Sequence, residues 1–172
     1  MKILLIVDVQ KGFTRTDKTK ETAKRIVDLS NSGSFDFIIA SRFVNKDDSP
    51  YVKYLNWNRL MTSPETDLVD NLKYDIHFDK ETYTCWSSKL ENILRSCNKG
   101  ILPTEIYLCG IDTDCCVLNT AVDLFENNIK PLILIDYCFS NGGQEYHDSA
   151  IKVLERNVGK QSIVRDFNNF KQ

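Results

Sequence analysis

The sequence predicts an α/β domain in which helices cover both faces of a parallel sheet, giving three layers. Short apolar runs recur from end to end of the 172-residue chain. Amphipathic stretches lie between them, with apolar residues three or four positions apart, as on one helix face. The runs are nearly continuous rather than alternating with polar residues, which is typical of strands buried on both faces.

The apolar runs define six expected strands. They are ILLIVDV at 3–9, FDFIIAS at 35–41, YDIHF at 74–78, EIYLCGI at 105–111, PLILIDY at 131–137 and, weakest, SIVRD at 162–166. For a doubly wound sheet of six strands the common order is 3-2-1-4-5-6, which we take as the expected topology.

Helical patterns fall between these strands. Apolar faces repeat at 23–27, 90–97, 118–125 and 150–154. Residues 43–72 are less periodic and carry aromatic residues such as Tyr51 and Trp57. A long irregular segment in a compact domain often forms a lid or pocket wall, and a short helix packed on the surface is an equal alternative.

Composition and charge are those of an ordinary globular protein. Hydrophobic residues make up 42% and charged residues 27%, so we expect one domain spanning 1–172. The net charge of −2 argues against a nucleic-acid or membrane partner, and no apolar run approaches the roughly 18 residues of a membrane span.

The opening MKILLIVDVQ has a lysine before an apolar run, as signal peptides do. The run is short and Asp8 interrupts it, so we interpret it as a buried strand and expect a cytoplasmic protein. The six cysteines form no CxxC pair, which argues against a zinc cluster or a disulfide framework. No glycine-rich phosphate loop follows the first strand, so we expect no nucleotide cofactor.

Reactive side chains stand at the ends of three expected strands. Asp8 closes the first strand, Lys80 follows the third, and Cys116 follows the fourth in GIDTDCCVLNT. In an open parallel sheet, ligands bind beyond the carboxyl ends of the strands, where the strand order reverses. With the order 3-2-1-4-5-6 the first and fourth strands flank that point, so the three side chains would gather there.

A carboxylate, an amine and a thiol can together form a nucleophilic system. Cys116 lies in the first turn of an expected helix, where the dipole and free N–H groups favour a thiolate. Lys80 would stabilise that thiolate, Asp8 could accept its proton, and backbone N–H groups from Asp112 to Cys116 could hold an oxyanion. Each residue alone has an ordinary structural explanation, and only their joint placement favours catalysis.

These segments resemble the isochorismatase-like cysteine hydrolases, which include nicotinamidases, N-carbamoylsarcosine amidohydrolases and isochorismatases. LLIVDVQKGF is similar to the family's first strand, with its catalytic aspartate at Asp8, and DKETYTCWSSKL to its lysine segment, with the catalytic lysine at Lys80. CGIDTDCCVLNTAVDLFE is similar to the nucleophile segment, in which the cysteine directly precedes a valine. That match makes Cys116 the nucleophile and leaves Cys115 as its neighbour.

The resemblance implies hydrolysis of a small amide, ureido or carbamoyl compound through a thioester on Cys116, with Asp8 moving the protons. It also implies a non-proline cis peptide, here Ile111–Asp112, that would aim the Asp112 and Cys116 amides into the oxyanion hole. Family members are commonly dimers or tetramers, so we expect a homo-oligomer.

Two departures from the family pattern affect the expected chemistry. Nicotinamidases carry an Asp-x-His metal motif after the second strand, where this chain has Phe43 and Asn45 in SRFVN. We therefore expect no catalytic metal and do not favour nicotinamide as substrate. The family often has a small residue where this chain has Asp112, whose acidic side chain could alter the pocket or pair with a basic group.

Other candidates and functions stay open. Phe13, Trp86 and Gln10 are weaker candidates for substrate binding, since packing or loop hydrogen bonding explains them equally well. His147 opens the last helix, where a structural role is favoured over a catalytic one. A catalytically idle binding module and an isochorismatase-type hydrolase are the alternative functions. Isochorismatase proper lacks the nucleophilic cysteine, and a redox role for adjacent cysteines would need a strained ring.

Overall fold

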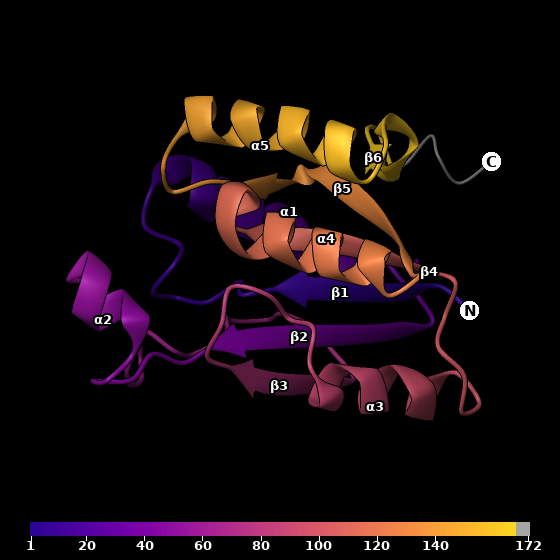
Figure 1. Cartoon of the computed structure of the whole chain (residues 1–172), viewed down its shortest axis with the longest axis horizontal. Coiled ribbons are helices and arrows are strands. Elements are labelled where there is room, and N and C mark those ends of the chain that lie inside the picture. The colour runs from indigo at the N-terminus through magenta and orange to yellow at the C-terminus, as the bar shows by residue number, and fades with distance from the viewer. Residues whose placement is uncertain (168–172) are drawn as a thin grey trace.

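A six-stranded parallel sheet forms the centre of the structure, a computed structural model that describes residues 1–167 (Figure 1). The strands lie in the order β3-β2-β1-β4-β5-β6, and every neighbouring pair is parallel. They are β1 (Ile3–Val7), β2 (Phe37–Phe43), β3 (Ile76–Lys80), β4 (Glu105–Ile111), β5 (Lys130–Phe139) and β6 (Ile163–Val164). The expected sheet and its order 3-2-1-4-5-6 are confirmed.

Helices flank the sheet, with α4 in front of it and α1 behind it in the view of Figure 1. The helical patterns correspond to α1 (Asp17–Asn31), α3 (Ser88–Cys97), α4 (Leu118–Glu126) and α5 (Gln144–Asn157). Thr16 and Ser87 begin α1 and α3, because each side chain accepts a hydrogen bond from a backbone N–H in the first turn. A π-helical turn, η1 (Thr113–Val117), leads into α4, and a 3-10 turn, η2 (Lys160–Ser162), precedes β6.

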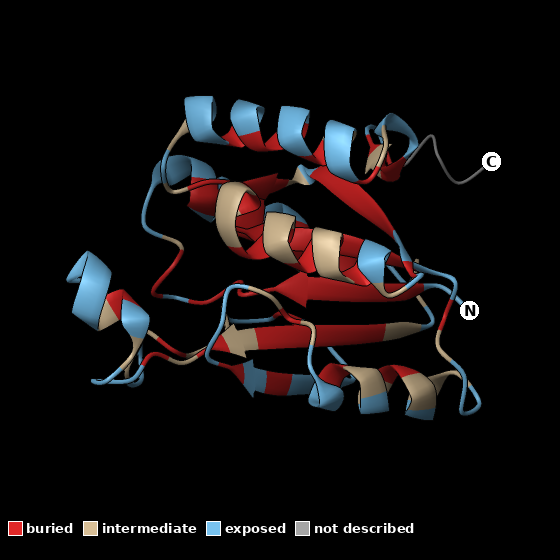
Figure 2. Ribbon diagram, viewed as in Figure 1, coloured by how far each residue is buried: buried red, intermediate tan, exposed pale blue. Residues whose placement is uncertain are grey.

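The central strands β1, β2 and β4 are mostly buried, as Figure 2 shows, and their apolar residues belong to the main core. All five residues of β1 are buried, so the opening apolar run is a core strand. Burying one such aliphatic side chain contributes about 1.5–3 kcal/mol. Among residues 1–167, no helix is long and apolar enough to cross a membrane. None of the six cysteines forms a disulfide.

A glycine lets β1 and β4 approach closely at the point where the strand order reverses. Val7 pairs with Gly110, and a Cβ atom at Gly110 would lie 2.1 Å from the carbonyl oxygen of Val7. Gly110 also has a φ of 143°, which side-chain-bearing residues rarely adopt. Because of this approach, Asp8 follows β1 right beside the chain that leaves β4.

The irregular segment after β2 contains one short helix, α2 (Pro50–Leu55), which projects beyond the carboxyl ends of β1, β2 and β3 (Figure 1). Its residues join a second apolar cluster, separate from the main core, that includes Phe13, Phe43, Tyr51 and Trp57. Both sequence-based interpretations of this segment therefore hold in part: a short helix forms, and its neighbours build a wall.

Candidate active site

Asp8 lies immediately after β1 and is completely buried. Its φ of 52° falls in the left-handed region, which is uncommon for a residue other than glycine. Ser41 of β2 holds it there, since the Ser41 hydroxyl donates to Asp8 Oδ1 at 2.6 Å and accepts from the Asp8 N–H at 3.2 Å. The Ser41 contacts leave the other carboxylate oxygen, Oδ2, facing Lys80.

Lys80 is the last residue of β3, and its ammonium is the buried partner of Asp8. Lys80 Nζ lies 2.7 Å from Asp8 Oδ2 and donates to the carbonyl oxygens of Thr82 and Tyr83 at 2.7 and 3.0 Å. Burial is the largest single effect and lowers the Lys80 pKa, but Asp8, Cys116 and Cys85 together outweigh it, so the net pKa is raised. The amine therefore stays charged at neutral pH.

Asp8 Oδ2 makes this ion pair, and the Asp8 side chain also lies within hydrogen-bonding reach of the Cys116 thiol. A carboxylate oxygen has a second lone pair, so Oδ2 can accept a proton while it faces Lys80. The thiol of Cys116 is the candidate donor, because it lies close enough for both Asp8 and Lys80 to influence its pKa.

Cys116 lies in η1, with 3% of its surface exposed. Burial raises the pKa of this thiol well above its usual range; Lys80 lowers it, and Asp8 raises it further. The resting sulfur is therefore protonated, which differs from the thiolate favoured by its place at a helix start. The reason is that burial, the largest effect on this thiol, outweighs the lowering by Lys80.

The chain leaves β4 through a cis peptide bond between Ile111 and Asp112, as the family resemblance implies. The Asp112 carboxylate oxygen Oδ1 accepts hydrogen bonds from the Asn141 backbone N–H and from Asn141 Nδ2, both at 2.7 Å. Burial raises the Asp112 pKa to about 6, against the opposing effect of the Asn141 hydrogen bonds. Asn141 Nδ2 also donates to the carbonyl oxygen of Phe13 at 2.8 Å, which ties together the two sides of the site.

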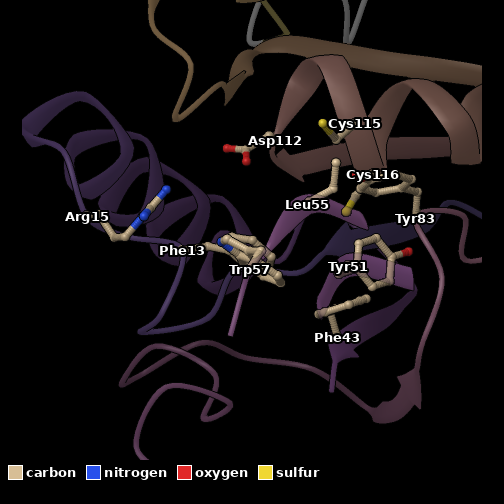
Figure 3. Close-up of a pocket in the computed structure, with 10 residues that line it drawn as sticks. All are labelled: Phe13, Arg15, Phe43, Tyr51, Leu55, Trp57, Tyr83, Asp112, Cys115 and Cys116. Atoms are coloured by element: carbon tan, nitrogen blue, oxygen red, sulfur yellow. The ribbon is translucent and has the colours of Figure 1, made fainter. Parts of the chain in front are cut away.

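A cavity of about 220 Å³ opens beside Cys116. Its other lining residues, shown in Figure 3, are Phe13, Arg15, Phe43, Tyr51, Leu55, Trp57, Tyr83, Asp112 and Cys115. Aromatic rings dominate the wall, and the Phe13 and Trp57 rings stack with centroids 6.0 Å apart. The cavity can therefore hold a small molecule with an apolar or flat body next to the thiol.

Of the three weaker substrate-binding candidates, only Phe13 lines this cavity. Trp86, two residues before α3, packs against the main core instead and is not part of the cavity lining. Gln10 is buried and fully engaged: its amide exchanges two hydrogen bonds with the Phe43 backbone and donates a third to the Thr66 carbonyl. Gln10 thus joins the ends of β1 and β2 and does not face the cavity.

Several residues of the site had no part in the sequence-based prediction. Ser41 lies near the carboxyl end of β2, and Asn141 lies two residues after the end of β5. The rule that identified Asp8, a polar residue where a parallel strand ends, would have found both. Arg15, Leu55 and Tyr83 carry no comparable signal, because their place on the wall depends on how the loops fold.

His147 lies in the first turn of α5 and outside the cavity lining. Its Nδ1 is 2.8 Å from the Thr113 hydroxyl, and its ring stacks on Phe139 with centroids 5.1 Å apart. Burial lowers the His147 pKa, which favours the neutral ring. These contacts support the structural role, in which His147 positions the start of η1.

The residues at the expected metal positions do not fit a metal ion. Phe43 presents an aromatic ring. The Asn45 side chain donates to the carbonyl oxygens of Trp57 and Arg59 and accepts hydrogen bonds from the Lys46 N–H and the Ser49 hydroxyl. Within the described part of the chain, no three or more His, Cys, Asp or Glu residues gather where they could hold a metal.

Comparisons with known proteins agree with this fold. The nicotinamidase PncA of Bacillus subtilis superposes with a TM-score of 0.76 at 21% identity, covering 93% of this chain and 97% of that one. The N-carbamoylsarcosine amidase of Thermoplasma acidophilum gives a TM-score of 0.74 at 20% identity, covering 96% and 99%. At these identities the likeness establishes the fold.

Two further comparisons concern the sequence. The mouse isochorismatase domain-containing protein 2A is 42% identical over 36 residues, which are 21% of this chain and 18% of the mouse protein. The match thus spans about a fifth of that relative's length. The isochorismatase domain model, by contrast, matches residues 2–164. This match covers nearly the whole chain, including all the strands and helices described above. The chain therefore belongs to the isochorismatase domain family.

Proposed function

We propose that this protein is a cysteine-dependent amidohydrolase that cleaves a C–N bond of a small amide, ureido or carbamoyl compound without a metal. The observation that carries the proposal is the meeting of Asp8, Lys80 and Cys116 beside a cavity of suitable size. The family match and the amidases among the similar structures support the same reaction class.

The first half of the reaction forms a thioester. The Cys116 thiol gives its proton to Asp8 Oδ2 while the sulfur bonds to the substrate carbonyl carbon, and the carbonyl oxygen takes up negative charge. The backbone amides of Asp112 and Cys116 are the proposed donors to this oxyanion. When the intermediate collapses, the C–N bond breaks and the leaving nitrogen takes the proton held by Asp8.

The second half releases the product. A water molecule gives a proton to Asp8 and adds its oxygen to the thioester carbonyl. The C–S bond then breaks, and Cys116 leaves as a thiolate that recovers the proton from Asp8. Lys80 acts in both halves through its charge, because it stabilises the carboxylate at rest and the thiolate when it forms.

Further properties belong to the same proposal. The unsuitability of Phe43 and Asn45 as ligands supports a metal-independent reaction. By family resemblance we infer a homo-oligomer, dimer or tetramer, that acts in the cytoplasm on a small-molecule substrate. Light scattering of the purified protein after size exclusion would test the assembly, and a monomer would contradict it.

An ammonia-release screen over small amides, ureido and carbamoyl compounds tests the function. We expect at least one substrate to be hydrolysed, and Cys116→Ala to reduce kcat more than ~1000-fold, as removal of a nucleophile does elsewhere. We expect Asp8→Asn to cost at least ~100-fold, as loss of a general base does.

Mass spectrometry provides the decisive control. With the wild-type protein a quenched reaction should contain an acyl group on Cys116, and the matched Cys115→Ala variant should form the same adduct. Turnover that survives in Cys116→Ala would exclude the thioester mechanism. Release of pyruvate from isochorismate with no amide turnover would favour the isochorismatase-type alternative.

A further inference from the structure

The cavity beside Cys116 has an aromatic wall of Phe13, Trp57, Tyr51 and Tyr83. Phe13 stacks on Trp57, Trp57 meets Tyr51 edge to face at 6.2 Å, and Tyr51 meets Tyr83 in the same way at 5.0 Å. The faces of such rings attract cations within about 6 Å, most strongly where water is excluded. A positively charged group would therefore be favoured along this wall.

Asp112 is the carboxylate of this cavity. The two Asn141 hydrogen bonds to Oδ1 fix its orientation, and no hydrogen bond to Oδ2 is found within residues 1–167. Figure 3 shows the carboxylate pointing away from Cys115, toward the side of the cavity where Arg15 lies. Asp112 thus presents an oriented, partly buried carboxylate to the cavity, four residues before Cys116.

Negative charge dominates around the cavity. The charges of Asp114 and Asp112 add to the effect of burial in raising the pKa of both Cys115 and Tyr83, which lie on different parts of the wall. Arg15 is the single cationic side chain of the lining. It is exposed and forms no ion pair with Asp112 in the described chain. The Asp8–Lys80 pair is neutral as a whole.

We propose that Asp112 and the aromatic wall select a substrate that carries an ammonium or similar cationic group near its scissile amide. This inference rests on the proposed hydrolase function and narrows its substrate class to small amino-substituted amides. Asp112 acts here as a specificity residue with no part in proton transfer, at a position where the family often has a small side chain.

Charged thiol reagents test the electrostatics of the cavity without needing a substrate. Methanethiosulfonates with a 2-trimethylammonioethyl or a 2-sulfonatoethyl group are compared for their rates of reaction at Cys116, resolved from Cys115 by peptide mass spectrometry. Relative to free cysteine, we expect the cationic reagent to be favoured at Cys116 by ~10-fold or more, since a carboxylate acts at short range in a partly dry cavity.

Two variants change the cavity charge in opposite directions. Asp112→Asn keeps an oxygen that can accept from Asn141, and we expect it to bring the rate ratio within about threefold of free cysteine. Arg15→Gln removes an exposed cation, and we expect it to increase the preference for the cationic reagent. An unchanged ratio in Asp112→Asn, or a preference of the wild type for the anionic reagent, overturns the inference.

Three amides of similar shape then separate selectivity from chemistry: 4-(aminomethyl)benzamide, 4-(hydroxymethyl)benzamide and 4-carboxybenzamide. We expect the cation to have the highest kcat/KM and Asp112→Asn to lose that preference mainly through KM. Equal turnover of all three amides would contradict the proposed selectivity but not the hydrolase function. If labelling of Cys116 is charge-selective and no amide in the wider screen is hydrolysed, the hydrolase function is contradicted while the charge preference of the cavity stands.

Discussion

Asp8 and Lys80 bury opposite charges 2.7 Å apart in the interior of the protein. Both side chains are at least 96% buried, so neither charge can return to water when its partner is removed. A buried pair of this kind costs much to break, although its net contribution over apolar residues is small. Asp8 and Lys80 should therefore be coupled in stability as well as in chemistry.

The first prediction concerns this coupling. Lys80→Met and Asp8→Asn should each lower the free energy of unfolding by about 3–5 kcal/mol, because each leaves one buried charge unpaired. The double variant should lose clearly less than the sum of the two. Urea denaturation of the four proteins measures the cycle. If the two single variants each lose less than about 1 kcal/mol and their losses add up in the double variant, the ion pair does not hold in solution.

Asp112 gives the second prediction, which concerns pH. Its pKa is raised from 3.8 to about 6 in the folded protein, first by burial, with Asp114 adding to the rise and Arg15 opposing it. The folded state therefore binds this proton more tightly than the unfolded chain does. Its contribution to stability is fully present below pH ~3.8 and is lost as pH rises toward ~6.

Replacing the carboxyl with an amide removes that loss. We expect Asp112→Asn to be more stable than the wild type at pH 7, and the difference to shrink as pH falls to 4. Thermal unfolding of both proteins between pH 4 and 8 measures it, with Glu126→Gln at the exposed end of α4 as a surface control. A difference that stays constant with pH would mean that Asp112 titrates normally.

At the scale of elements, the wall of the site depends on one asparagine. Asn45 follows β2 and holds residues 46–59 through two donated and two accepted hydrogen bonds. Tyr51 and Trp57, both in that segment, form part of the cavity wall. By the family resemblance, this is the position of the metal motif of nicotinamidases. In this chain the Asn45 side-chain amide orders the loop instead.

The third prediction follows from those contacts. Asn45→Ala should lower stability by about 1–3 kcal/mol, since it leaves partly buried backbone groups of the loop without their hydrogen-bond partner. It should also raise KM more than it lowers kcat, because the aromatic wall loosens while the thiol stays in place. Lys46→Ala is the matched control, since it keeps the backbone N–H that donates a hydrogen bond to Asn45 Oδ1. Limited proteolysis should cleave residues 46–59 faster in Asn45→Ala alone.

At the scale of the whole molecule, three distant segments meet at one edge of the sheet. Asp8 comes from the end of β1, Lys80 from the end of β3 and Cys116 from the turn after β4. The strand order brings the three side chains together. The structure of the site should then depend only on correct folding of the sheet.

The fourth prediction is that chelation has no effect. Dialysis against EDTA should leave both the melting temperature and the turnover of an identified substrate unchanged, because Phe43 and Asn45 offer no ligands. Enzyme dialysed without chelator serves as the control. Activity that is lost with EDTA and restored by added zinc, iron or manganese would contradict a metal-independent reaction.

The sequence by itself determined the elements and the chemistry available at their ends. Hydrophobic periodicity is a local property, so it located every strand and the long helices, and the strand-end rule selected Asp8, Lys80 and Cys116. Residue types alone also excluded the usual metal motif, through Phe43 and Asn45.

Only the tertiary structure decided how these groups are surrounded. The tertiary structure shows that Gln10 and Trp86 lie outside the cavity and that Tyr83 and Arg15 line it. These positions follow from loop paths, which depend on long-range packing. Burial in the folded protein also raises the pKa of the Cys116 thiol. This effect depends on packing from all sides, which no spacing in the chain reveals.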